Sequence, residues 1–390
     1  MSVLKRTIAW VTLFAGIWGN AGVLWAQKTS PVFQWITRAH IAAIYNDNLV
    51  IGTESRTPLP PLDDRYLNYT VDVGFRLALP YSQFLTAMYS YNKEDEQQVT
   101  FLRRVDQVFY GEWWGQLGRF LRYQVVARYQ SFDFVELSEL NFNQFSLKGY
   151  TVWQIPNGMQ IHLDVSREQK RFVRPSDNVT GYSLVDASEN RLNMRWRKWV
   201  TRHWRIDFRL LVGAITYAPT KSVFLNNLSG LSPVQQRKDK RLIFHPRIGR
   251  LLWNDALYLS SGIQVEQNHS NSDYYDFSGV QVTGDVAWSL ATHHFLAVEG
   301  AYGVYRYPRR RFDSRYRNTK EDFRLSFSVT YQWEITAYLE LELNYQLLQN
   351  NSNDSINYNP FTTLTYSTFQ QNMFKATVHV DLGRFLFNAD

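Results

Sequence analysis

Apolar and polar residues alternate along most of the chain, and the pattern is clearest near its C-terminal end. In 338–348, YLELELNYQLL, Leu339 and Leu341 fall on one parity while Glu340 and Glu342 fall on the other. Successive side chains of a β-strand point to opposite faces, whereas a helix would distribute these two sets around its circumference. The segment is therefore predicted to be a strand with one apolar face and one charged face.

Similar segments recur, and their length distinguishes between two kinds of β protein. The alternation persists for about ten residues or more in 66–79, 119–130 and 323–333. Strands of soluble proteins average about five or six residues, whereas a tilted strand needs about nine to eleven to cross a membrane. After the N-terminal segment, no apolar run approaches the length of a spanning helix. Any membrane insertion must therefore use strands.

The connections between these segments alternate between short and long. The short turns are expected at 80–82, 115–118, 156–158, 201–203, 254–256, 291–294 and 334–336. The longer polar loops are expected at 46–64, 93–97, 135–139, 173–187, 219–238, 269–276, 308–319 and 350–358. Tight turns on one side and longer loops on the other are typical of outer-membrane barrels. The prediction is an all-β, transmembrane, antiparallel up-and-down β-barrel of about 16 strands, with 14 to 18 as the range.

Tryptophan positions give a second argument for a membrane barrel. Most tryptophans beyond residue 26 lie within a few residues of an expected short turn: Trp113, Trp114, Trp153, Trp199, Trp204, Trp253, Trp288 and Trp333. Indole rings prefer the headgroup level of a bilayer, so this predicts an aromatic girdle at one end of the barrel. The alternative is a soluble propeller or sandwich, which is disfavoured because its strands should be shorter.

The first 26 residues do not belong to the barrel. Lys5 and Arg6 precede an apolar run over 7–19, and small residues follow. This is the pattern of a secretory signal peptide, with cleavage expected after Ala26 in preference to Ala21. An uncleaved anchor helix is disfavoured because the run is short and contains glycine. We therefore expect a signal peptide over 1–26 and a single barrel domain over 27–390.

Composition narrows the chemistry that the protein can carry. The chain has a formal charge of +7, which becomes +5 without Lys5 and Arg6. Such a mildly basic balance, with no aromatic-interleaved binding module, does not indicate nucleic acid as a partner. The chain has no cysteine, so disulfides and thiolate metal sites are impossible.

With the signal and the hairpin rhythm, three segments carry a family resemblance: YNDNL at 45–49, LELNYQLLQNNSNDS at 341–355 and FKATVHVDLGRFLF at 374–387. The chain resembles porin-like Gram-negative outer-membrane β-barrel proteins. It also resembles the barrels of exopolysaccharide-associated outer-membrane proteins and of surface-lipoprotein assembly modifiers, without their helical repeat domain. The chain also departs from the pattern by ending on Asn388, Ala389 and Asp390 instead of a terminal aromatic residue.

The resemblance implies an outer-membrane location with both termini in the periplasm. It also implies contact with outer-membrane lipid and lipopolysaccharide, and insertion by the barrel-assembly machinery. Small polar solutes or polysaccharide are the expected cargo. No cofactor is expected, and the oligomeric state stays open.

The lumen is the main candidate site. Parity directs these charged residues inward: Arg76, Arg122, Arg128, Arg195, Arg197, Arg205, Arg209, Arg324, Asp285, Glu299, Glu340 and Glu342. Arginine predominates on the fifth, eighth and ninth strands, and acids on the eleventh to thirteenth and the fifteenth. Opposed charges across a water-filled bore would orient polar solutes in a channel. Equally, the charges could pair with neighbours into a rigid network, giving a non-conducting structural, assembly or secretion-associated barrel.

A basic extracellular loop is the second candidate. It carries Arg309, Arg310, Arg311, Arg315 and Arg317. These side chains could capture an anionic solute or polysaccharide. Pairing with lipopolysaccharide phosphates is favoured, because guanidinium is a general phosphate partner.

Catalysis has little support in the sequence, and the protein is not expected to be an enzyme. There is no Gly-x-Ser-x-Gly motif, no His-Glu-x-x-His motif and no phosphate-binding loop. His162 with Asp164, and His379 with Asp381, share predicted luminal faces, but no serine nucleophile accompanies them. A barrel-embedded hydrolase is the least favoured alternative, and no metal site is expected.

Overall fold

The computed structural model describes residues 33–47, 64–96, 103–136, 141–173, 186–218, 236–271, 275–311, 319–352, 357–359, 362–365 and 369–381. The predicted signal peptide, 1–26, lies outside these ranges. In the part of the chain that is described, no helix is long and apolar enough to cross a membrane.

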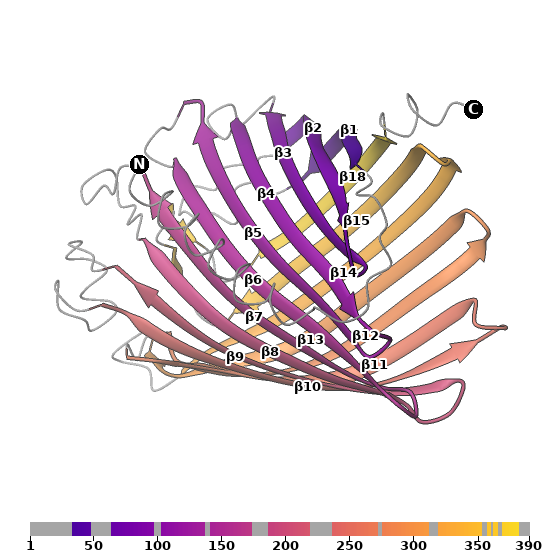
Figure 1. Ribbon diagram of the computed structural model, residues 1–390. Coiled ribbons are helices and arrows are strands. Elements are labelled where there is room, and N and C mark those ends of the chain that lie inside the picture. Colours follow the sequence, from indigo (N-terminus) through magenta and orange to yellow (C-terminus); the bar gives the residue numbers. More distant parts are fainter. Residues whose placement is uncertain are drawn as a thin grey trace.

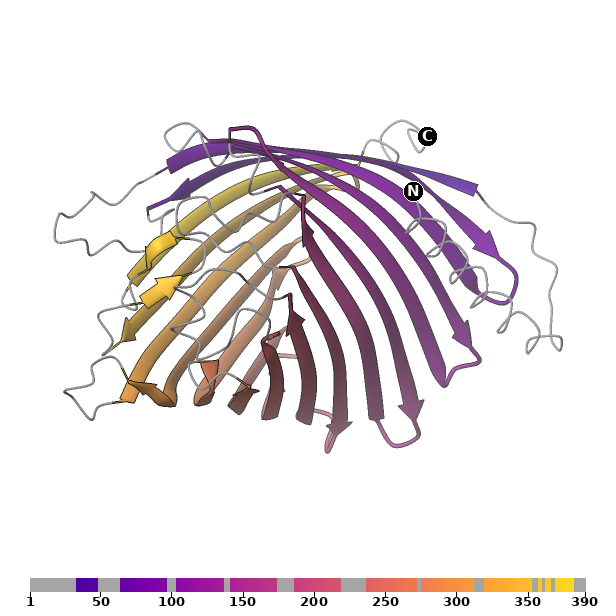
Figure 2. The same cartoon turned by 90° about the vertical axis from the view of Figure 1, so that its left-hand side faces the viewer.

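Sixteen strands form one closed antiparallel barrel, which confirms the predicted fold class (Figures 1 and 2). The first eight are β1 (Phe33–Asn46), β2 (Asp64–Leu79), β3 (Gln83–Glu96), β4 (Arg104–Leu117), β5 (Leu121–Phe134), β6 (Phe142–Ile155), β7 (Met159–Phe172) and β8 (Ala187–Trp199). The next eight are β9 (Trp204–Tyr217), β10 (Lys238–Leu252), β11 (Leu257–Ser270), β12 (Phe277–Ala291), β13 (His294–Arg311), β14 (Thr319–Thr336), β15 (Leu339–Ser352) and β18 (Phe369–Asp381).

The strand order around the barrel follows the chain, and the two ends of the barrel domain close the ring. Each strand pairs with its neighbours in sequence, and β18 pairs with β1, from Arg38 opposite Asp381 to Asn46 opposite Met373. Figure 1 shows β1, in indigo, beside the yellow β18. The short strands β16 (Asn357–Asn359) and β17 (Thr362–Thr365) form a separate hairpin between β15 and β18.

The two faces of the closed sheet differ sharply in chemistry. Leu343 on β15, Val282 on β12 and Phe109 on β4 belong to the outward face and are exposed. Asp72 and Asp207, on the other face, are buried. Side chains on the concave face of a barrel converge, so polar groups there can bury and pair with each other. The alternation in the sequence therefore corresponds to an apolar exterior and a polar interior.

Two predicted turns lie later in the chain than expected. β4 continues through 115 to Leu117, so the turn comprises 118–120. A Cβ on Gly115 would lie 2.3 Å from Tyr123 Oη, so this glycine makes room for a cross-strand ring and does not mark a turn. Gly118, with φ +56°, is the turn glycine. β14 likewise continues to Thr336, and the turn comprises 337–338.

The tryptophans lie near the short turns, as predicted, but they do not all face outward. Trp35, Trp153 and Trp333 are exposed on the outer face. Trp114 instead packs inside on Phe84, with 5.3 Å between ring centroids. Trp199 also faces inward, by its register with β9. The girdle prediction was therefore wrong for these two rings: adjacency to a turn does not determine which face a residue occupies.

Candidate functional site

All twelve charged residues predicted to line the lumen lie on the inward face. The pairing registers connect them: Arg76 lies opposite Thr86, Arg197 opposite Asp207, and Asp285 opposite Glu299. The registers place them together on one side of the sheet. These residues differ in the partners that their charged groups contact.

Three predicted lining arginines converge on one carboxylate. Arg195 Nε and Arg197 Nε donate to Asp207 Oδ1 at 3.0 and 3.1 Å, and Arg205 Nε donates to Oδ2 at 3.0 Å. The antiparallel register puts Arg197 directly opposite Asp207, and a spacing of two residues puts Arg195 and Arg205 on the same face. The side chain of Asp207 is only 3 % exposed. We call these four residues the Asp207 cluster; with three guanidinium groups and one carboxylate it keeps a net charge of +2.

The acids of β11 and β12 are also paired locally. Arg241 lies 2.7 Å from Glu266, and Arg247 contacts both Asp285 and Ser260. These pairs neutralise much of the acidic side that the sequence predicts on the eleventh and twelfth strands. The difference in charge between the arginine-rich side and the acidic side of the lumen is therefore smaller than the residue counts indicate.

A smaller set of charges has no opposite charge bound to it. Within the described residues, Arg122 and Arg128 on β5 and Glu299 on β13 form no ion pair. Arg209 donates only to the neutral Asn193 Oδ1, at 2.9 Å, and Arg76 only to Thr86 Oγ1, at 3.4 Å. Seven strands lie between β5 and β13 in either direction around the ring of sixteen, so these two strands lie opposite each other. Uncompensated positive and negative charge therefore do face each other across the barrel.

Two of the cavities between described side chains open on the inner face. One of about 510 Å³, near the long loops, is lined by Arg237, Tyr275, Tyr305, Lys320, Asp322 and Arg324. The guanidinium of Arg324 lies 4.0 Å from the centroid of the Tyr305 ring. The other, of about 350 Å³ and near the short turns, is lined by Trp114, Arg122, Gln124, Tyr150, His162 and Arg197. Both combine guanidinium groups with aromatic rings.

The predicted basic loop lies only partly within the described residues. β13 extends to Arg311, which pairs with Thr319 across an irregularity, so the connection spans 312–318 and not 308–319. Arg309 lies 3.7 Å from Asp276. The side chains of Arg310 and Arg311, and all of Arg315 and Arg317, lie outside the described part. The loop was predicted to start too early because β13 continues beyond Tyr307 to Arg311, across an irregularity in its pairing.

The histidine–aspartate pairs considered for catalysis have other partners. His162 Nδ1 lies 2.5 Å from Tyr150 Oη, and Asp164 pairs with Lys148 at 3.0 Å. His379 contacts His40 across the closing strands. Sequence reasoning missed two arrangements: the role of Asp207 as a common acceptor, and the position of His379 beside Glu340 and Glu342. The Arg-x-Arg and Arg-x-Asp spacings on consecutive strands are the signal that points to the first.

The fold and inner face define a closed, sixteen-strand antiparallel barrel with an apolar exterior and a charged interior. No protein-family model and no curated protein sequence matches the chain.

Similar solved structures are outer-membrane proteins. OccAB3 of Acinetobacter baumannii has a TM-score of 0.49 and 8% identity, over 88% of this chain and 98% of its own. OccD3 (OpdP) of Pseudomonas aeruginosa has a TM-score of 0.44 and 9% identity, over 89% of this chain and 91% of its own. A structure described as a bacterial polysaccharide outer membrane secretin has a TM-score of 0.45 and 11% identity, over 89% of this chain and 98% of its own. At these identities the likeness is one of fold.

Proposed function

We propose that the protein is an outer-membrane channel that passes small polar solutes and prefers anions. Its barrel strands run from 13 to 18 residues, more than the nine to eleven or so that cross a bilayer. Barrels of about sixteen strands are wide enough to hold an aqueous channel, whereas eight-stranded barrels are filled by side chains. The apolar exterior supports insertion in a membrane.

The observation that carries the proposal is the set of inward arginines without a carboxylate partner. Arg122, Arg128 and Arg209 lie on the inner face, and no carboxylate in the described ranges forms an ion pair with them. Guanidinium groups bind carboxylate and phosphate oxygens through charge-assisted hydrogen bonds. Solutes that bear these groups are the cargo that we propose.

The orientation follows from the same proposal. The short turns, the start of β1 and the end of β18 would lie in the periplasm, after removal of the signal peptide. Outward basic side chains near the long loops, such as Arg65 and Arg306, would then meet lipopolysaccharide phosphates at the outer leaflet.

The test is conductance of the refolded protein in a planar bilayer, with the reversal potential measured in asymmetric salt. The wild-type chain should give stable conductance steps and anion preference. Changing Arg122→Glu together with Arg128→Glu should shift the preference toward cations, because four units of charge change on one strand. The control is Arg306→Glu, on the outer face, which should leave the preference unchanged.

A second candidate is a non-conducting structural, assembly or secretion-associated barrel. The Asp207 cluster and the pair of Arg247 with Asp285 favour it, because they bind neighbouring strands together on the inner face. A folded barrel whose electrophoretic mobility changes on heating, but which never conducts, would exclude the open channel and support this candidate.

A further inference from the structure

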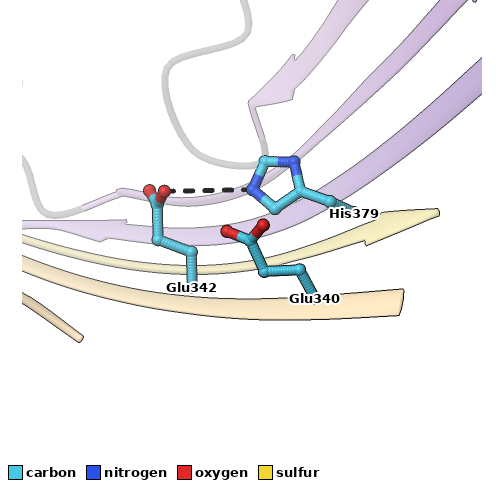
Figure 3. A group of neighbouring side chains, drawn as sticks. All are labelled: Glu340, Glu342 and His379. Carbon is cyan, nitrogen blue, oxygen red and sulfur yellow. Dashed lines mark ion pairs between the residues drawn. The ribbon is translucent and has the colours of Figure 1, made fainter. Parts of the chain in front are cut away.

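A separate polar group lies where the barrel closes. His379 on β18 has Glu340 of β15 opposite it on one side and His40 of β1 on the other. Glu342 lies two residues from Glu340, on the same face. Figure 3 shows the side chains of His379, Glu340 and Glu342 directed to the same side of the sheet. One nitrogen or oxygen from each of these three lies within 4.8 Å of the others.

The hydrogen bonds behind His379 determine which of its nitrogens carries a proton. His40 Nε2 lies 3.2 Å from Asp72 Oδ2, and the ionised carboxylate accepts only, so Nε2 of His40 donates. A neutral His40 then has a lone pair on Nδ1, which lies 2.5 Å from His379 Nδ1. His379 Nδ1 therefore donates, and Nε2 of His379 presents a lone pair. Ser90 Oγ also donates to Asp72, at 2.5 Å, and fixes this end of the chain of contacts.

The lone pair on Nε2 of His379 faces two carboxylates, and none of these three groups carries a proton to donate to the others. Nε2 of His379 lies 3.9 Å from Glu342 Oε2, too far for a hydrogen bond, and this buried nitrogen has no hydrogen-bond partner. Glu342 accepts only a long bond, 3.4 Å, from Gln332. Glu340 and the nearby Lys375 form no ion pair with any residue in the described ranges. The three acceptors therefore lie within 4.8 Å of one another, and no lysine or arginine in the described ranges forms an ion pair with them.

We propose that His379, Glu340 and Glu342 bind a divalent transition-metal ion, with Zn²⁺ the best match. Imidazole favours such ions over Mg²⁺ and Ca²⁺, and carboxylates are common further ligands. Bonds of about 2.0–2.2 Å put tetrahedral ligand atoms about 3.4 Å apart. Glutamate side chains need to move by only about 1 Å to reach that spacing from 4.8 Å.

Asp72 and His40 complete the site without touching the ion. A histidine that binds metal usually donates its other N–H to an acceptor that fixes its tautomer and ring orientation. Here His40 is that acceptor, and Asp72 holds His40. The ion would thus join β15 to β18 directly, and to β1 and β2 through these two residues. Because the site exists only when β18 has closed the barrel, metal binding should stabilise the closed state.

The experiment uses untagged full-length mature protein, refolded in detergent and titrated with Zn²⁺ against a competing chelator. One ion per chain should bind, and Zn²⁺ should raise the temperature at which the heated barrel changes mobility on electrophoresis. Co²⁺ in place of Zn²⁺ should give visible absorption bands from nitrogen and oxygen ligands. Both effects should disappear in His379→Ala and in the isosteric double change Glu340→Gln with Glu342→Gln.

Two further variants separate the site from non-specific binding. His40→Ala should retain one ion per chain but weaken binding by about 10- to 100-fold, the range found for residues that orient metal ligands. His162→Ala, an inward histidine bonded to Tyr150, should bind Zn²⁺ as wild type does. Unchanged binding in the glutamine double variant would overturn the proposal. So would a folded wild-type barrel that binds no Zn²⁺ at millimolar concentration, since the missing charge would then be a proton on His379.

Discussion

Replacing Asp207 with asparagine changes the charge of the inner face without changing the size of the side chain. In the wild type, one carboxylate accepts hydrogen bonds from Arg195, Arg197 and Arg205. Asp207→Asn raises the net charge of the Asp207 cluster from +2 to +3. If the protein is a channel, its preference for anions should therefore increase, even though no arginine is added.

The size of the increase follows from Coulomb's law. A unit charge about 8 Å from a permeating ion contributes about 0.5 kcal/mol in water, and about 0.2 kcal/mol after screening over one Debye length. Anions gain this energy and cations lose it, so the permeability ratio changes by about twofold. An effective dielectric constant of about 40 in the lumen would double the energy and give about fourfold.

The same substitution should lower the stability of the barrel. Removing one partner of a buried ion pair costs about 3–5 kcal/mol, because the other charge is left uncompensated. The three arginine side chains are 14 to 31 % exposed to the lumen, so water replaces part of the lost interaction. We therefore expect a loss below that range, seen as a lower temperature for the change in electrophoretic mobility.

The assay is the reversal potential in asymmetric salt, for wild type, Asp207→Asn and Asp207→Glu. The glutamate variant keeps the charge but changes the geometry, so its selectivity should stay close to wild type. Equal or weaker anion preference in Asp207→Asn would refute the electrostatic reasoning. A glutamate variant that shifts as much as the asparagine variant would attribute the effect to packing.

Three further predictions concern the fold. Gly279→Val should destabilise the barrel by about 1–3 kcal/mol in urea unfolding, because a Cβ there would lie 2.4 Å from the buried ring of Tyr305. Gly300→Val is the control and should cost less, because the nearest atom to its Cβ, on Phe327, lies 3.9 Å away. Asp322→Asn should cost about 3 kcal/mol, because it removes the carboxylate beside a lysine that is 2 % exposed, and an unchanged urea midpoint would contradict this. In single-tryptophan variants, brominated lipid should quench Trp153, on the outer face, and not Trp199, on the inner face; equal quenching would contradict the assigned faces.

The sequence predicted the fold well because each strand carries its own two-residue period. The alternation in 338–348 assigns Glu340 and Glu342 to one face without knowledge of any neighbour, and β15 (Leu339–Ser352) has that arrangement. Strand ends were less predictable. Glycine has two roles in a barrel, and Gly115 makes room for Tyr123 where Gly118 forms the turn.

Partners across strands could not be predicted in the same way. Parity says that Arg197 and Asp207 share a face, but only the pairing register says that they lie directly opposite each other. A shift of two residues would keep both on the inner face and separate their charged groups. The contact of His379 with His40 depends in addition on which strand closes the ring, because 339 residues separate them in the chain.

The inward charges of this barrel should therefore be counted in two sets: those bound to an opposite charge and those that are not. Five arginines on β8 and β9 face inward, but four of them bind carboxylates: Arg191 binds Glu189, and the other three share Asp207. With their two carboxylates, those four keep a net charge of +2, or half a unit for each arginine. Each arginine that no carboxylate binds contributes a full unit to the electric field in the lumen, chiefly on β5 and at Arg209. Substitution of an arginine that no carboxylate binds should therefore change the reversal potential with little loss of stability, whereas substitution within the Asp207 cluster should change both.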